Sequence, residues 1–229
     1  MKRTIKKFFS DYYPIKELSK TNMDKKLSKS ILNEFSNEEK ITRIQLAACY
    51  RLFNKFGWDD TIYGHLTAKI PNTNHFLINP FGLLYNEITA SSLVKVDLNG
   101  NIIHPGSTDL SINEAGFVIH SAIHKNREDI HSVFHCHQFH STAVSCSEFI
   151  PISQTSHTIG SFSHHEYEGI FINEELQKKL IQDLGNNRIL ILRNHGVVTC
   201  GSTISESFLL MYNLIEACKI QATASSMSI

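Results

Sequence analysis

The chain has 229 residues, 41% of them hydrophobic, which is enough to bury the core of one α/β domain. Lysine and arginine (22) balance aspartate and glutamate (22), so no strong overall field attracts nucleic acid or an anionic membrane. The five cysteines are widely spaced and lack a CxxC pair, which disfavours zinc-finger and disulfide scaffolds and is typical of reduced thiols. With no apolar run suited to a signal peptide or a membrane span, we expect a cytoplasmic protein that binds a small molecule.

The first elements are an N-terminal arm and a helix. Residues 1–35 are rich in Lys, Ser and Asn, so we expect a loosely ordered arm before a single domain over 36–229. Ser36 and Glu39 have the spacing of a capping box, and apolar residues follow at helical intervals until Gly57. This pattern predicts an amphipathic helix that opens the domain.

Short strands are predicted over 66–70, 76–79 and 93–98. The last is joined through Asn99-Gly100 to 101–103, and Asn-Gly between strand-forming runs indicates a hairpin because both residues accept positive φ. Part of the sheet is therefore expected to be antiparallel.

Two more helices and two more strands complete the expected domain. Ser111 with Glu114, and Thr203 with Glu206, have the spacing of further capping boxes, each followed by helical periodicity. The second of these helices should bury a stripe of Phe208, Met211, Tyr212, Ile215 and Cys218. Strands are predicted over 130–137 and 189–192, the latter buried on both faces. Helices that alternate with hairpins favour a mixed sheet covered by helices.

A pair of histidines on the predicted strand 130–137 points to metal binding. Side chains alternate along a strand, so His135 and His137 share one face while Cys136 points to the other. Imidazoles suit zinc, manganese and iron. His195, which ends a buried strand beside Gly196, is the natural choice for a third ligand, but sequence spacing alone does not show that it lies near the other two. By itself, however, an HxH pattern equally fits a surface strand pair.

A resemblance to a known family adds to this pattern. The chain resembles the class II aldolase and adducin family in four segments that occur in the family's order, over roughly residues 38 to 226. They are Gly64-His65-Leu66-Thr67, residues 76–82, residues 133–137 and residues 192–196. Residues 113–117 through His120 and His124, with 166–169 and 217–221, resemble the adducin-head-like branch more closely than the sugar-phosphate aldolases.

The resemblance implies a fold, an assembly and a cofactor. The fold is a three-layer α/β/α sandwich with a mixed, largely antiparallel sheet, often a homotetramer with active sites between subunits. The matching His135, His137 and His195 would hold a divalent ion, zinc first, with manganese or iron as alternatives. In the aldolases this ion polarises a carbonyl and stabilises an enediolate.

The chain also departs from the aldolases. Counting back without gaps, the family's catalytic carboxylate falls at Gly116, and its phosphate-binding serines fall at Glu114 and Ala115. Glu114 lies two residues away and is our candidate base or fourth metal ligand, although its position as the capping-box partner of Ser111 already explains it. Loss of both serines argues against a phosphorylated substrate.

Other matching positions give candidate substrate-binding residues. His65 and Gly82 match pocket loops of the family, while His120 is expected to bind substrate or to hydrogen-bond behind the ligands. Tyr167 is the candidate proton donor.

Three functions remain open. The first is a metal-dependent lyase that cleaves or decarboxylates a small non-phosphorylated oxo or hydroxy acid through a metal-stabilised enolate. The second is a non-haem iron oxygenase that acts on an aromatic oxo acid, as the resemblance to some adducin-branch enzymes implies. The third is a non-catalytic interaction module like the adducin heads.

Overall fold

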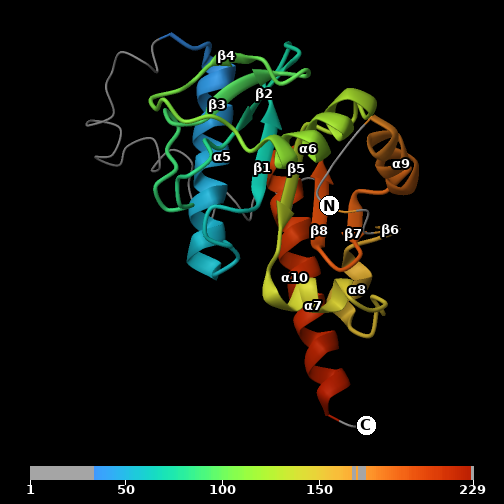
Figure 1. Ribbon diagram of the computed structural model, residues 1–229. Coiled ribbons are helices and arrows are strands. Elements are labelled where there is room, and N and C mark those ends of the chain that lie inside the picture. The colour runs from blue at the N-terminus through green and yellow to red at the C-terminus, as the bar shows by residue number, and fades with distance from the viewer. Residues whose placement is uncertain (1–33, 167–168, 170–173, 228–229) are drawn as a thin grey trace.

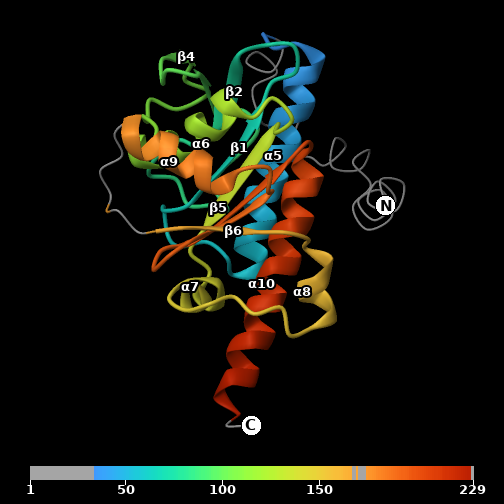
Figure 2. The same cartoon turned by 90° about the vertical axis from the view of Figure 1, so that its right-hand side faces the viewer.

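A computed structural model describes residues 34–166, 169 and 174–227, and these residues form a three-layer α/β/α sandwich (Figures 1 and 2). The middle layer is an eight-stranded sheet in the order β4-β3-β2-β1-β5-β8-β7-β6. Only β6 and β7 pair in parallel among the described strands, so the sheet is mixed and largely antiparallel, as predicted. The strands are β1 (His65–Lys69), β2 (His75–Ile78), β3 (Val94–Asp97), β4 (Ile102–His104), β5 (Ser132–Cys136), β6 (Ser163–His165), β7 (Ile189–Leu192) and β8 (Gly196–Gly201).

Helices cover both faces of the sheet. They are α5 (Asn37–Phe56), α6 (Glu114–Asn126), α7 (Phe139–Ser145), α8 (Gln154–Thr158), α9 (Glu174–Leu184) and α10 (Ile204–Ser226). Figure 2 shows α5 and α10 on one side of the sheet and α6 with α9 on the other. We call these sides the α5 face and the α6 face. None of the helices in the described part of the chain combines the length and hydropathy that a bilayer crossing requires.

The central strands are buried on both faces, which sets the direction of each side chain. Phe134 and Cys136 of β5 belong to the core under α5 and α10. Val133 belongs to the core under α6 and α9, so His135, two residues on, points to the α6 face. The side chains of His135 and Cys136 therefore lie on opposite faces of the sheet, as predicted.

The helix predicted after Ser36 is present as α5. Ser36 caps the helix by accepting a hydrogen bond from the Glu39 amide, and Gly57 ends it with φ 66°. Residues 1–33 of the predicted arm lie outside the described residues. Phe35, the last residue of the predicted arm, has a buried side chain. The Arg43 guanidinium lies 3.9 Å from the centroid of the Phe35 ring.

The start of α6 differs from the prediction. The N-cap is Asn113, whose side chain accepts a hydrogen bond from the Gly116 amide, and Glu114 is the first helical residue. The Ser111 carbonyl instead accepts a hydrogen bond from the Phe81 amide, which holds this segment extended beside the loop after β2. The predicted cap at Ser111 is therefore wrong by two residues, because a tertiary contact delays the helix.

Two smaller expectations are also corrected. The hairpin between β3 and β4 forms, but only Gly100 of the Asn99-Gly100 pair has positive φ (93°). Tyr212 was predicted on the buried stripe of α10 and is 37% exposed, because its ring lies against Phe56 and Trp58 at the edge of the core.

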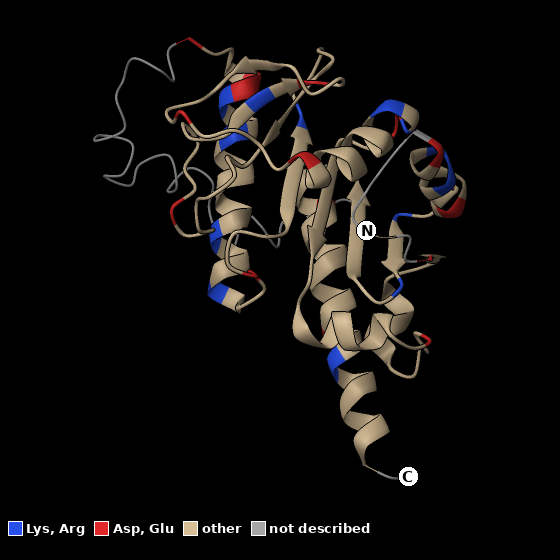
Figure 3. Cartoon of the chain, viewed as in Figure 1, with Lys and Arg blue, Asp and Glu red and all other residues tan. Residues whose placement is uncertain are grey.

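Charge is mixed along the surface elements. Figure 3 shows residues of both signs following one another along α5 and along α9. This interleaving agrees with the balanced composition and gives neither helix a field of one sign.

Candidate metal centre

Three histidines that are far apart in sequence come together at one end of the sheet. His135 lies near the end of β5, His137 follows that strand, and His195 lies in the turn between β7 and β8. The pairing of β5 with β8 places Cys136 opposite Val197, which brings the β7–β8 turn alongside His137. One ligand atom from each histidine lies within 4.8 Å of the others.

The β7–β8 turn can approach β5 because of two residues. Asn194 adopts φ 56°, a left-handed conformation that asparagine tolerates better than most residues. A Cβ at Gly196 would lie 2.6 Å from the Cys136 carbonyl oxygen and 3.0 Å from the His137 ring. Only glycine permits this approach, which is the role predicted for Gly196.

Hydrogen bonds orient two of the three rings. His135 Nδ1 lies 3.0 Å from the Val197 carbonyl oxygen, which can only accept, so Nδ1 carries the hydrogen and Nε2 keeps a lone pair. His137 Nδ1 lies 3.3 Å from an Asp60 carboxylate oxygen, which also can only accept, so this Nδ1 carries a hydrogen. His137 Nε2 lies 3.0 Å from His195 Nε2.

The surroundings of His135 and His195 favour the neutral imidazole, which is the form that binds metal. Burial lowers the pKa of His135 well below its usual value, and charge on His137 and His195 would lower it further. Burial, followed by His137, lowers the pKa of His195 to about 4.

The donor set fits a divalent ion. Tetrahedral zinc with Zn–N bonds near 2.0–2.1 Å separates its nitrogen ligands by roughly 3.3 Å. The 3.0 Å between the Nε2 atoms of His137 and His195 is close to this separation. Three neutral imidazoles leave coordination positions open, as a catalytic site requires.

Asp60 is a candidate functional residue that sequence reasoning missed. Its carboxylate accepts the hydrogen of His137 Nδ1, the arrangement by which carboxylates fix the orientation of histidine ligands. Seventy-seven positions separate the two residues, and no periodicity connects them. Only the tertiary structure reveals the contact.

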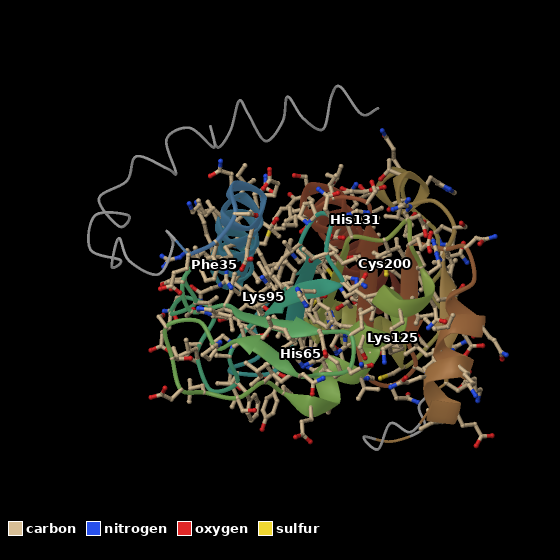
Figure 4. The ribbon with its side chains drawn as sticks, turned by 90° about the horizontal axis from the view of Figure 1, so that it is seen from above. Phe35, His65, Lys95, Lys125, His131 and Cys200 are labelled. Carbon is tan, nitrogen blue, oxygen red and sulfur yellow. The ribbon has the colours of Figure 1, made fainter. Side chains whose placement is uncertain are left out.

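His65, a predicted substrate-binding residue, lies beside this cluster. Its Cα pairs with that of His135 across β1 and β5, and the two rings lie 5.5 Å apart at 25°. Burial, followed by charge on His137 and His195, lowers the pKa of His65 to about 3. Figure 4, seen from above, shows His65 on the side of the molecule opposite α5.

His120 and His124 form a buried group behind His65. The Thr67 hydroxyl lies 2.7 Å from His120 Nδ1 and 2.8 Å from His124 Nε2. The His120 ring meets the His65 ring edge to face, with centroids 5.5 Å apart. His120 thus contacts a neighbour of the ligand candidates, in keeping with the supporting role considered for it.

The other predicted site residues lie apart from the cluster or outside the described residues. Glu114 is exposed at the first position of α6 and is not part of the three-histidine group. Gly82 lies in the loop after β2 with φ 111°. Tyr167 lies outside the described residues.

Comparison with known proteins identifies the family. The family model described as "Class II Aldolase and Adducin N-terminal domain" matches residues 44–222. An adducin-related protein of Schizosaccharomyces pombe is 48% identical over 94% of this chain and 68% of its own length. The chain belongs to the class II aldolase and adducin family.

Solved structures of class II aldolase relatives share the fold. An aldolase II superfamily protein from Pseudomonas syringae is 44% identical, with a TM-score of 0.84 over 86% of this chain and 81% of its own. An L-fuculose 1-phosphate aldolase from Glaciozyma antarctica is 31% identical, with a TM-score of 0.75 over 82% of this chain and 75% of its own. Class II aldolases typically depend on a divalent metal, and the three-histidine group is the candidate site for one here.

Glycine at position 116, where the aldolase pattern has its carboxylate, is required by the packing of His65. A Cβ at this position would lie 2.1 Å from His65 Nε2, so the imidazole occupies the space that any larger residue would need. Glu114 lies two positions earlier, about 200° around the helix axis, and therefore points away from His65.

Proposed function

We propose that this protein is a metal-dependent lyase that cleaves or decarboxylates a small, non-phosphorylated oxo or hydroxy acid. The observation that carries the proposal is the convergence of the imidazoles of His135, His137 and His195, with burial lowering the pKa of His135 and of His195. Similarity to an aldolase over most of the chain supports the same reaction class.

The chain's residues would divide the work as follows. His135, His137 and His195 would hold the ion, while Val197 and Asp60 keep the rings of His135 and His137 in the ligating orientation. A bound divalent ion would polarise the substrate carbonyl and stabilise the developing enolate as a Lewis acid.

The first turn of α6 supports a substrate without a phosphate group. Helix N-termini attract anions through their free amide groups. Here the Asn113 side chain occupies the Gly116 amide, and Glu114 adds a negative charge at the first position. A phosphate dianion would meet this charge, so a monocarboxylate is the better match.

Proton transfer is assigned to Glu114 and Tyr167. Glu114 as base would have to act from the exposed side of α6, so Glu114→Gln should lower kcat strongly if it has that role. Tyr167→Phe tests the proposed donor in the same way. We include His65, His120 and Gly82 as substrate-binding residues, zinc as the metal and a cytoplasmic homotetramer as the working form.

The proposal is tested by metal analysis and by turnover. Protein purified without chelator should contain about one divalent ion per chain by elemental analysis. The zinc- or manganese-loaded protein should then release product from a panel of hydroxy and oxo acids. His135→Ala and His195→Ala should each lose both the metal and the turnover.

His157→Ala is the matched control, because this histidine is exposed on α8 and should affect neither property. A metal-loaded wild-type protein that turns over none of the panel would contradict the lyase. Iron with oxygen uptake on an aromatic oxo acid would instead support the oxygenase.

A non-catalytic module is the second candidate. It is favoured by Gly116 at the position counted for the aldolase carboxylate and by the similarity to an adducin-related protein. Native protein without bound metal, and with no loss of stability in His135→Ala beyond that of His157→Ala, would favour this function.

A further inference from the structure

The cap of α6 determines how one side chain amide faces His65. Asn113 Oδ1 accepts a hydrogen bond from the Gly116 amide at 3.3 Å. With the oxygen committed to the cap, the amide nitrogen Nδ2 is the atom that lies 3.3 Å from His65 Nε2. An amide nitrogen offers only hydrogens, so His65 Nε2 must accept this bond.

This contact determines the tautomer of His65. A neutral imidazole carries one hydrogen, and a ring that accepts at Nε2 carries it at Nδ1. His65 is 5% exposed, and its ring neighbours include the imidazoles of His120 and His135. Because Nε2 accepts the hydrogen bond from Asn113, the single ring hydrogen lies on Nδ1.

The resulting N–H group has no acceptor. His65 Nδ1 is buried and finds no hydrogen-bond partner among the residues that the structure describes. Folded proteins pair nearly all buried donors, so an unpaired one indicates a ligand or water that completes it. This donor belongs to the ring that lies directly beside His135 of the candidate metal centre.

Gly116 makes this arrangement possible. A Cβ at position 116 would lie 2.1 Å from Nε2 and 2.3 Å from Cε1 of His65, so the ring fits only against a glycine. Asn113 therefore hydrogen-bonds to the His65 imidazole, and Gly116 leaves the space that this ring occupies.

We propose that His65 is an oxygen-binding donor of the site, with Asn113 as the positioning residue that sets its tautomer. Its Nδ1–H would bind a carboxylate or carbonyl oxygen of the substrate acid. The inference rests on the proposed function and deepens it, because it makes His65 a hydrogen-bond donor to the substrate and not a base that takes a proton from it. A small oxo acid, which carries several oxygen acceptors, is the substrate class that such a donor recognises.

The tautomer is tested first, in the metal-free full-length protein. Imidazole ¹⁵N chemical shifts distinguish a protonated Nδ1 from a protonated Nε2, and loss of the signal in His65→Asn assigns the resonance. We expect the hydrogen on Nδ1. In Asn113→Ser, which retains a capping oxygen but lacks the amide hydrogens, we expect a shift toward the other tautomer. A wild-type hydrogen on Nε2, or unchanged shifts in Asn113→Ser, would overturn the assignment.

The donor is tested by binding of pyruvate, a monocarboxylate oxo acid, to the zinc-loaded protein, measured by calorimetry. His65→Leu removes the donor at similar volume, and we expect about tenfold or greater weakening with the zinc content unchanged. His65→Asn places an amide hydrogen near the position of Nδ1, so its affinity should stay within about threefold of the wild type. Thermal melts of both variants establish that they are folded.

Equal pyruvate affinity in His65→Leu and wild type would contradict the proposal, as would a zinc-loaded wild type that does not bind pyruvate. Wild-type protein that holds no zinc would refute the proposed function instead. The ¹⁵N measurement requires no metal, so it would still decide the role of Asn113.

Discussion

Asp60 is the residue on which the orientation of His137 depends. Its carboxylate is half exposed and lies 3.3 Å from His137 Nδ1, so the contact is electrostatically modest but directional. Asp60→Ala should weaken zinc binding about tenfold or more, because the ring loses the acceptor that keeps Nε2 on the metal side. Competition with a chromophoric chelator measures the affinity.

Asp59→Ala is the control for that loop, since the Asp59 carboxylate bonds to Asn54 and not to a ligand candidate. Asp60→Asn, which keeps an acceptor without the charge, should fall between Asp60→Ala and wild type. Equal zinc affinities in Asp59→Ala and Asp60→Ala would show that the carboxylate of Asp60 has no orienting role.

Thr67 is the residue that satisfies two buried imidazoles at once. Thr67→Val keeps the shape of the side chain but leaves His120 Nδ1 and His124 Nε2 without the hydroxyl. We expect it to lower the free energy of unfolding by about 2 kcal/mol or more, given about 1–3 kcal/mol for each unsatisfied buried group.

Thr67→Ser keeps the hydroxyl and loses only a methyl group, so it should retain most of the stability. Urea denaturation compares the two variants. If Thr67→Val proves as stable as Thr67→Ser, the hydroxyl does not stabilise the imidazole pair.

At the scale of elements, helix propensity and side-chain packing favour different residues at position 116 of α6. Replacing glycine by alanine inside a helix normally stabilises it by up to about 1 kcal/mol. At Gly116 the added Cβ would lie 2.1 Å from the buried His65 ring, so we expect Gly116→Ala to destabilise the protein. In a His65→Ala background the clash is absent, and the same change should become neutral or stabilising.

Urea denaturation of the two single variants, the double variant and the wild type completes this cycle. The coupling free energy should favour the double variant over the sum of the single changes. Additive effects would contradict the close packing of Gly116 against His65.

For the whole molecule, buried histidines make stability depend on pH. Burial, followed by the charge of Lys69, lowers the pKa of His124 to about 3, and burial lowers that of His120 well below its usual value. In the unfolded chain these two imidazoles therefore bind protons near pH 6.5, whereas in the folded chain they remain unprotonated at that pH. Stability is fully present above pH 6.5 and should fall as the pH drops from 6.5 toward 3.

Urea denaturation of the metal-free protein at pH 7.5, 6 and 5 measures this dependence. His124→Gln should make the slope shallower by up to about 1.4 kcal/mol per pH unit, because glutamine takes no proton in the unfolded state. His157→Gln removes an exposed histidine and should leave the slope unchanged. A slope in His124→Gln equal to that of the wild type would contradict a contribution from His124.

Periodicity and turn chemistry determined much of the fold from the sequence alone. Ser36, Gly57 and Thr203 mark helix ends in the structure because capping depends on local backbone geometry. Alternation along β5 placed His135 on the side opposite Cys136 because the side-chain period of a strand is local too, whereas His137 lies just beyond the end of the strand.

Only the tertiary structure decided what depends on contacts between distant segments. The cap at Asn113 depends on a bond between Phe81 and Ser111, and β6 and β8 lie in segments with no strand prediction. The approach of His195 to His137 depends on the pairing of β5 with β8. The bond from Asp60 to His137 and the packing of His65 on Gly116 join residues whose separation in sequence carries no period, so no local pattern could predict them.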